Sequence, residues 1–226
     1  EVKWNILYGF ASENERVYRD LAALIDRIVH LVPPMAIGRV RVDRFSPFFE
    51  RPAEFGLIDI RPAEAFRFVY PFPDESLARL AYYFRGRHAS GNDPASLAGP
   101  LREAVARWQE VHPVSRLAAA DQGDDTLIIT DTRPCASRFQ IRLKGIEAEI
   151  YRFCDTGRSR RAIVEHVRDL EASSSTEATN GFGPSALEKV IRRWNDDALI
   201  AEIDGRILAL AVRVPEQSEL YRAAHS

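Results

Sequence analysis

The chain has 226 residues, of which 46% are hydrophobic and 28% charged, a composition that allows one large domain or two small ones with a sizeable core. A formal net charge of −2 and a pI near 6.3 give no electrostatic reason to expect a polyanionic partner, so nucleic acid binding is disfavoured. No apolar run approaches the roughly 20 residues that cross a bilayer, so we expect no membrane partner. Two cysteines, whose spacing fits no metal site, favour a reducing compartment and hence the cytoplasm.

The first 44 residues are predicted to form a strand, a helix and a second strand. An apolar run from Trp4 to Tyr8 predicts the first strand, and apolar residues at helical spacing from Val17 to Leu31 predict the helix. Pro33 and Pro34 end that helix, and Arg39 to Arg44 alternates charged and apolar residues as a second, parallel strand would. Because parallel strands are covered on both faces, this segment indicates the end of a larger barrel or sheet.

Polar and aromatic side chains follow both predicted strands, at the edge where parallel α/β proteins bind ligands. Asp43 could accept hydrogen bonds from a substrate amine, and Arg44 could hold a carboxylate. The predicted substrate-facing edge consists of Tyr8, Asp43, Arg44, Ser46 and Tyr70. The residues by themselves favour a simpler interpretation, in which Asp43 and Arg44 pair with neighbours and the aromatic rings pack against the next helix.

Residues 53–114 are predicted to be a helical connecting segment. Apolar residues recur at helical spacing between Glu75 and Phe84, and a second helix is predicted from the Asn92-Asp93-Pro94 capping sequence through Trp108. Across the whole chain, no histidine has a second ligand at metal-binding spacing, and no nucleophile motif occurs. We therefore assign no metal site and no catalytic residue.

Residues 115–215 are predicted to form an α+β winged-helix domain, followed by a tail of residues 216–226. Three strands come first, then three helices with apolar stripes, and finally a hairpin whose turn is Asp204-Gly205. The predicted strands are Leu117 to Ala120, Thr126 to Thr130 and Phe139 to Leu143, and the helices begin near Ile146, Ser159 and Pro184. The third strand alternates apolar and polar residues strictly, which indicates one buried face.

The last predicted helix could read DNA, bind a peptide, or only dock on a neighbouring domain. Its basic residues Lys189, Arg192 and Arg193 lie among Glu188, Asp196 and Asp197, which would weaken the attraction to phosphate. For peptide binding, an extended segment could add as a further strand at the third strand, with the helix as the opposite wall of a groove. The predicted peptide-binding residues are Phe139, Ile141, Leu143, Val190, Arg193 and Trp194.

Several phrases of the sequence resemble the C-terminal half of cobalamin-binding radical SAM enzymes that mature ribosomal peptides such as bacteriocins. They are, in order, WNILYGF, HLVPP, RVRVDRFSP with the following FFERPAEFGL, YPFP and LARLAYYF, and they cover residues 4–84. Residues 117–212, which end in ILALAV, resemble the closing region of these enzymes. This region is also similar to the RiPP recognition element, a winged helix that binds the leader of a precursor peptide.

The resemblance implies an α/β partial radical SAM barrel in residues 1–52, namely its last strand-helix-strand segment, before the helical segment and the winged-helix domain. It also implies a parent enzyme that uses S-adenosylmethionine, a four-iron four-sulfur cluster and cobalamin to alkylate, often to methylate, a peptide carbon. The Cys-x-x-x-Cys-x-x-Cys motif of the family is absent, and Cys135 and Cys154 cannot replace it. We therefore expect no cofactor within these residues and no catalysis by them alone.

Three functional hypotheses follow from these observations. The preferred one is the C-terminal part of a cobalamin-dependent radical SAM peptide maturase, which binds the leader of a ribosomal precursor peptide and works with the missing N-terminal part of the parent enzyme. The first alternative is a non-catalytic peptide-binding or scaffold protein derived from such an enzyme. The second is a winged-helix DNA-binding regulator, which the mixed charge of the last helix disfavours.

Overall fold

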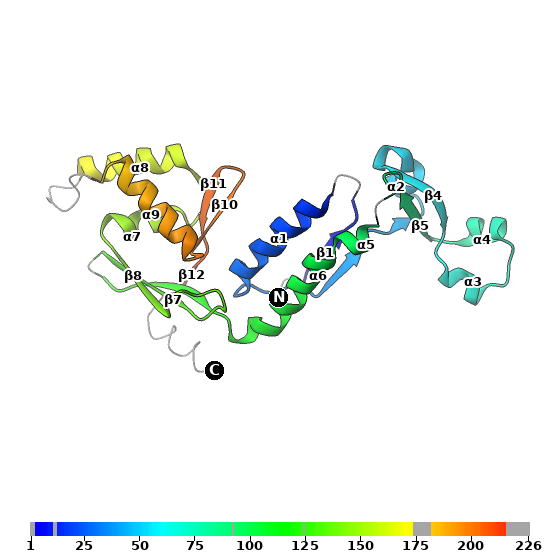
Figure 1. Cartoon of the computed structure of the whole chain (residues 1–226), viewed down its shortest axis with the longest axis horizontal. Coiled ribbons are helices and arrows are strands. Elements are labelled where there is room, and N and C mark those ends of the chain that lie inside the picture. The colour runs from blue at the N-terminus through cyan, green and yellow to red at the C-terminus, as the bar shows by residue number, and fades with distance from the viewer. Residues whose placement is uncertain (1–2, 11–12, 92, 124, 174–181, 216–226) are drawn as a thin grey trace. The chain divides into compact units, whose positions relative to one another are not determined.

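The structure, a computed structural model, describes residues 3–10, 13–91, 93–123, 125–173 and 182–215 (Figure 1). The chain consists of two compact units, of which unit 1 comprises Glu1–Ala22 and Pro34–Ala106, and unit 2 comprises Ala23–Pro33 and Arg107–Ser226. The boundaries fall inside helices α1 (Glu15–Ile28) and α6 (Gly99–Val111), so this division differs from the predicted boundaries after residues 52 and 114. Within the described ranges, no helix combines the length and apolar character needed to cross a membrane.

Unit 1 begins with a parallel strand pair. Strands β1 (Asn5–Tyr8) and β2 (Ala36–Arg39) are connected through α1 and lie in parallel register, which confirms the predicted strand, helix and parallel strand. The predicted extent of the second strand, to Arg44, is wrong because β2 ends at Arg39 and the short β3 (Val42–Asp43) pairs in another sheet. Charged and apolar residues alternate without a break from Arg39 to Asp43. The pattern therefore does not reveal that the chain passes from one sheet to another here. The sheets formed by the described residues are small and none of them is closed, so the radical SAM barrel stays a prediction.

A second sheet of unit 1 lies where the sequence predicted only helices. Strands β4 (Leu57–Pro62) and β5 (Tyr83–His88) pair antiparallel, and the sheet has the order β3-β5-β4. The predicted helix through Phe84 ends early, as α4 (Asp74–Leu80), because the apolar residues after it begin β5. A short apolar run does not distinguish a strand from a helix, which explains the error. The other short helices here are α2 (Pro47–Glu50), η1 (Pro52–Phe55), α3 (Ala65–Val69) and α5 (Pro94–Leu97).

The core of this second sheet is built largely from aromatic rings. Phe49 packs against the buried Phe84 with ring centroids 4.6 Å apart, and Phe48 packs against Phe55 at 4.5 Å. The rings surround a small cluster of buried residues that includes Leu57. Phe48 and Phe49, which follow the predicted barrel strand, therefore pack in a core, whereas Phe45 is 72% exposed.

Unit 2 contains a four-stranded sheet with helices on one side (Figure 1). In spatial order its strands are β12 (Val212–Arg213), β6 (Leu117–Asp121), β7 (Thr126–Asp131) and β8 (Gln140–Lys144). The last three pair antiparallel, whereas β12 is parallel to β6. The helices are η2 (His112–Val114) before the sheet, and α7 (Ile146–Phe153), α8 (Arg160–Ser173) and α9 (Pro184–Asp196) after β8. The three predicted strands and the three predicted helices are confirmed.

The predicted terminal hairpin is also present, as β10 (Ile200–Ile203) and β11 (Arg206–Ala209). Its turn residues Asp204 and Gly205 have φ angles of 51° and 71°, the left-handed conformation that a two-residue hairpin turn requires. Strand β11 also pairs with β9 (Arg158–Ser159), which the sequence did not predict because two residues carry no periodicity. The elements match the predicted order, while their assignment to the winged-helix family stays a prediction.

A continuous hydrophobic core joins the sheet of unit 2 to its helices. The apolar residues on one face of β7 and β8 pack against the inner faces of α7, α8 and α9. Leu24 and Ile28 from the C-terminal half of α1 pack against the same core, which explains why this half belongs to unit 2. The largest buried side chain of the cluster is Trp194, with an exposed fraction of 0%.

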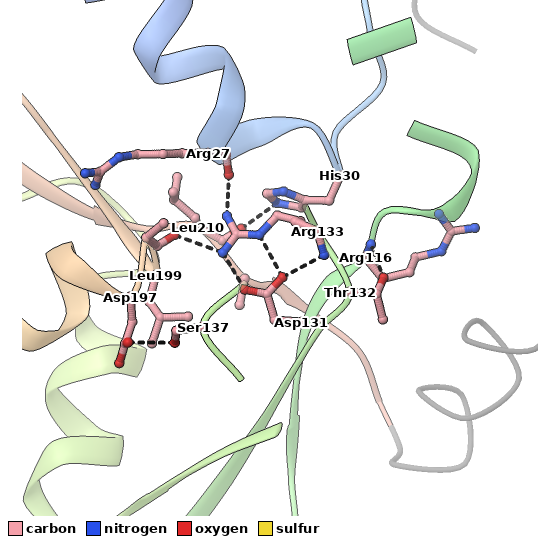
Figure 2. A network of polar contacts seen from close by, with 12 residues as sticks. Arg27, His30, Arg116, Asp131, Thr132, Arg133, Ser137, Asp197, Leu199 and Leu210 are labelled. Atoms are coloured by element: carbon pink, nitrogen blue, oxygen red, sulfur yellow. Dashed lines mark hydrogen bonds and ion pairs between the residues drawn. The ribbon is translucent and has the colours of Figure 1, made fainter. Parts of the chain in front are cut away.

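A buried ion pair lies beside this core (Figure 2). The side chains of Asp131 and Arg133 are 1% and 0% exposed, and Arg133 Nη2 lies 2.6 Å from Asp131 Oδ2. Arg133 also donates to the backbone carbonyl of Arg27 in α1 and, over 3.0 Å, to that of Ala198 after α9. The guanidinium group of Arg133 therefore connects the end of β7 with α1 and with the residues that follow α9.

His30 is a neutral member of this buried network. Its Nε2 lies 2.9 Å from the carbonyl oxygen of Leu210 and donates a hydrogen bond to it. Within the described part of the chain, Nδ1 has no hydrogen-bond partner. Burial lowers the pKa of His30 to about 4, and the positive charge of Arg133 acts in the same direction.

The low pKa of His30 predicts that acid destabilises unit 2. His30 takes up a proton near pH 6.5 in the unfolded chain and near pH 4 in the folded one. The folded state therefore has its full stability above pH 6.5, and it loses stability as the pH falls from 6.5 toward 4. Between pH 7 and pH 4.5 the loss from His30 is about 2 to 3 kcal/mol. Urea denaturation at both pH values measures the free energy of unfolding. Its drop from pH 7 to pH 4.5 should be smaller in His30→Gln than in the wild type by this amount. An equal difference in the two proteins would contradict the assignment.

Candidate functional site

The open edge of the four-stranded sheet is the candidate site in unit 2. Strand β8 is the last strand in the sheet order, and no described strand other than β7 pairs with it. An unpaired edge presents backbone N–H and C=O groups that can pair with another extended segment. Which residues supply those groups depends on the register of β8 against β7.

Two backbone hydrogen bonds at the ends of the strand pair fix that register. The amide nitrogen of Asp131 lies 2.9 Å from the carbonyl oxygen of Phe139, and the amide nitrogen of Gly145 lies 2.9 Å from the carbonyl oxygen of Asp125. In an antiparallel pair, hydrogen-bonded and non-hydrogen-bonded residue pairs alternate along the strand. The odd-numbered residues 139–145 therefore direct their backbone groups toward β7.

The even-numbered residues direct their backbone groups away from β7. We call the backbone of Gln140, Arg142 and Lys144 the β8 edge. The side chains of these residues are exposed, since they lie on the opposite face from the core. The β8 edge thus combines backbone groups that no strand of the described residues pairs with and an accessible, partly basic row of side chains.

The structure corrects the predicted set of peptide-binding side chains. Ile141 and Leu143 point into the core below the sheet, and so do Val190 and Trp194 on α9. These four side chains therefore cannot line a groove for a peptide. Phe139 is 55% exposed and remains accessible at the start of the strand.

The predicted basic face of α9 is partly neutralised. Arg193 lies 2.5 Å from the carboxylate of Glu147, so the remaining predicted peptide contact already has a partner. Asp197, directly after α9, accepts hydrogen bonds from Ser137 over 2.7 Å and from Arg138 over 2.8 Å. These contacts hold the C-terminal end of α9 close to both ends of β8 and weaken any attraction of this helix to DNA phosphates.

Arg44, predicted to hold a substrate carboxylate, is instead a structural residue. Its Nε donates to the carbonyl oxygen of Ala81 over 2.7 Å, and its Nη2 donates to that of Ala78. The guanidinium carbon lies 5.4 Å from the ring centroid of Phe49 and 5.1 Å from that of Phe84. Arg44 therefore holds the end of α4 against the aromatic core.

The other residues of the predicted barrel edge also serve local structure and do not meet in one site. The side chain of Ser46 accepts a hydrogen bond from an amide at the start of α2 and caps this helix. Asp43 forms an ion pair with Arg41 at 3.5 Å. Tyr8 is buried, and Tyr70 lies between the rings of two phenylalanines.

A cavity nevertheless lies at the carboxyl ends of β1 and β2, with a volume of about 470 Å³. It is lined by Gly9 and Phe10 after β1, by Arg39–Val42 at the end of β2, and by residues of β5 including His88. None of the five predicted barrel-edge residues lines it. The signal that could have identified the lining residues is the pair of arginines in Arg39-Val40-Arg41, directly at the strand end.

Hydrogen bonds hold Gly9 and Phe10, the residues directly after β1, at this cavity. The Glu13 carboxylate accepts from the amides of Gly9 and Phe10 over 2.7 and 2.9 Å, and the Tyr18 hydroxyl donates to the same oxygen over 2.6 Å. His88 Nε2 lies 3.0 Å from the Gly9 carbonyl oxygen. Burial and the hydrogen bond to Glu13 raise the pKa of Tyr18 to about 12, so it stays a donor. These groups therefore fix the backbone of Gly9 and Phe10.

The described residues offer no clear metal centre. None of their histidine, cysteine and acidic side chains gather in threes or more as a metal site would need. Cys154 is buried, and its burial raises the pKa of the thiol to about 11, whereas Cys135 is exposed. Cys154 therefore remains a protonated thiol at neutral pH.

Neither family models nor curated proteins match this sequence, and no solved structure matches its fold. The β8 edge and the cavity of unit 1 are therefore interpreted from their own chemistry.

Proposed function

We propose that unit 2 binds an extended peptide as an additional strand at the β8 edge, and that this peptide is the leader of a ribosomal precursor. The observation that carries the proposal is the outward direction of the backbone groups of Gln140, Arg142 and Lys144. Each of these residues offers one N–H donor and one C=O acceptor to an incoming strand. Affinity would come from these main-chain hydrogen bonds, and specificity from the exposed side chains beside them.

The wider proposal is that the chain is the C-terminal part of a cobalamin-dependent radical SAM enzyme that modifies the bound peptide. It is supported by the ordered phrases over residues 4–84 and by the confirmed strand-helix-strand segment at their start. Leader binding would hold the rest of the precursor at a high effective concentration near the active site. The cluster, S-adenosylmethionine and cobalamin would belong to the remainder of a cytoplasmic parent enzyme.

The coding sequence upstream of residue 1 tests the enzyme part of the proposal. An in-frame Cys-x-x-x-Cys-x-x-Cys motif is expected there. A start codon directly upstream of the codon for Glu1 would favour the non-catalytic peptide-binding protein instead. The peptide-binding part of the proposal is unaffected by this result and needs a separate test.

Strand addition predicts that a proline at Arg142 prevents peptide binding. Proline removes the outward-facing amide of residue 142, and an edge strand tolerates proline at such a position. Titration of a fluorescent leader peptide against the full chain should give a Kd at least about tenfold higher for Arg142→Pro than for the wild type. Proline at Ile141 is unsuitable, because the Ile141 amide bonds to β7.

Arg142→Ala is the matched control, because it removes the same side chain and keeps the amide. Its Kd should lie within about threefold of the wild-type value, since an exposed side chain contributes little. Circular dichroism should be the same for both variants. An equal loss of affinity in the two variants would assign binding to the arginine side chain, and no binding by the wild-type chain would defeat the proposal.

A further inference from the structure

Three arginines of unit 1 lie close together without a matching set of acidic partners. Arg61 on β4 and Arg85 on β5 stand directly opposite each other in the antiparallel pair. Arg39, at the end of β2, donates over 3.0 Å to the carbonyl oxygen of Gly86, the residue after Arg85. Like charges directly opposite each other in a sheet are destabilising, so the arrangement needs an explanation other than folding. We call Arg39, Arg61 and Arg85 the arginine cluster.

The carboxylates nearest to the cluster are mostly engaged elsewhere. Asp59 forms its ion pair with Arg87 at 2.9 Å, and Asp93 caps α5 through its side chain. Glu64 is exposed at the same surface. Among the described residues, no carboxylate forms an ion pair with a member of the arginine cluster. Among the described residues, Arg61 and Arg85 therefore have no carboxylate in an ion pair, whereas Arg39 lies close enough to Asp93 to help lower the pKa of that carboxyl.

The cluster lies where two cavities of unit 1 meet. Arg39 and Arg85 line both of them, together with Gly86 and His88. The first cavity, of about 470 Å³, is otherwise largely aromatic and apolar, with Phe10, Phe48, Phe55, Leu57, Tyr83 and Phe84 in its wall. The second, of about 620 Å³, is an open hollow lined mainly by charged residues of both signs, among them Arg61. Both volumes fall in the range of small-molecule binding sites.

We propose that unit 1 binds a small organic anion at this junction. Its aromatic or apolar body occupies the first cavity, and its carboxylate or phosphate group binds Arg39 and Arg85, with Arg61 beside them. Guanidinium groups suit this role because they bind both kinds of anion through two parallel hydrogen bonds. Arg41 lies at the rim of the first cavity, where its guanidinium carbon is 4.5 Å from the ring centroid of Tyr83 and its charge is paired with Asp43. The residues of this site all belong to unit 1, whereas those of the proposed peptide-binding edge belong to unit 2.

Isothermal titration of the full chain at low salt tests the proposal with four probes. Phenyl phosphate and phenylacetate carry the two possible anionic groups on an aromatic body, inorganic phosphate lacks the body, and benzyl alcohol lacks the charge. One or both aromatic anions should bind at least about tenfold more tightly than inorganic phosphate and benzyl alcohol. Whichever aromatic anion binds more tightly identifies the preferred group.

Methionine variants locate the site. Arg39→Met and Arg85→Met should each raise the Kd of the aromatic anion about tenfold, whereas Arg16→Met, at a position 88% exposed on α1, should leave it unchanged. Without ligand, Arg85→Met should unfold at a temperature no lower than the wild type, because the repulsion with Arg61 is gone. The proposal is overturned if neither aromatic anion binds, if benzyl alcohol or inorganic phosphate binds as tightly, or if the two variants keep wild-type affinity.

Discussion

Replacing Arg133 by methionine is expected to lower the free energy of unfolding by about 3 to 5 kcal/mol, as the loss of one partner of a buried ion pair does elsewhere. Asp131 would keep only the hydrogen bond from the amide of residue 133, while its carboxylate stayed buried. The carbonyl groups of Arg27 and Ala198 would lose their donor at the same time. Urea denaturation of the variant at pH 7 measures the loss.

The double variant Asp131→Asn with Arg133→Met is the informative control. It removes the unpaired charge, so it should be more stable than Arg133→Met alone. Arg161→Met serves as the surface comparison, because Arg161 and Glu165 form an exposed ion pair on α8, and its effect should stay within about 1 kcal/mol. If Arg133→Met and Arg161→Met had equal effects, the buried pair would not hold unit 2 together.

Trp194→Ala is expected to cost about 3 to 5 kcal/mol, the usual range for removing a large aromatic side chain from a core. The ring is 0% exposed and meets the ring of Tyr151 edge to face, with centroids 5.2 Å apart. Within the described part of the chain its Nε1 has no hydrogen-bond partner. Trp194→Phe should therefore be much milder than Trp194→Ala, and thermal unfolding of both variants would show the difference.

The same pair of variants separates a core role for Trp194 from the predicted contact with a peptide. A core residue affects how much protein is folded, and not the affinity of the folded molecule. Trp194→Phe should accordingly bind the leader peptide with the wild-type Kd. A large loss of affinity in Trp194→Phe, with unchanged thermal stability, would restore the peptide contact that the sequence predicted.

Unit 2 could be predicted from the sequence because its elements carry strong local patterns. The strict alternation from Phe139 to Leu143 indicated a strand with one buried face, and Asp204-Gly205 indicated the hairpin turn. Unit 1 was harder, because β4 and β5 carry Arg61, Arg85 and Arg87 and are separated by two small helices. Their pairing comes from tertiary contacts of the aromatic core, which periodicity does not reveal.

The candidate sites depend on geometry that a pattern cannot supply. Alternation indicated which side chains of β8 are buried, but not which backbone groups face β7; this follows from the register at Phe139 and Gly145. The predicted peptide contact of the Ile141 side chain is wrong, because this side chain lies in the core on the face that the alternation marks as buried. The pairing of Arg61 with Arg85 likewise depends on the antiparallel register of strands more than 20 residues apart.

Amide hydrogen exchange of the full chain, measured by NMR with and without the leader peptide, tests strand addition most directly. In the free chain the amides of Ile141 and Leu143 should exchange slowly and those of Arg142 and Lys144 quickly, because only the former bond to β7. Bound leader peptide should slow the exchange of Arg142 and Lys144 to the rate of their neighbours. If the peptide binds and these two amides still exchange at the free rate, the β8 edge is not the binding site.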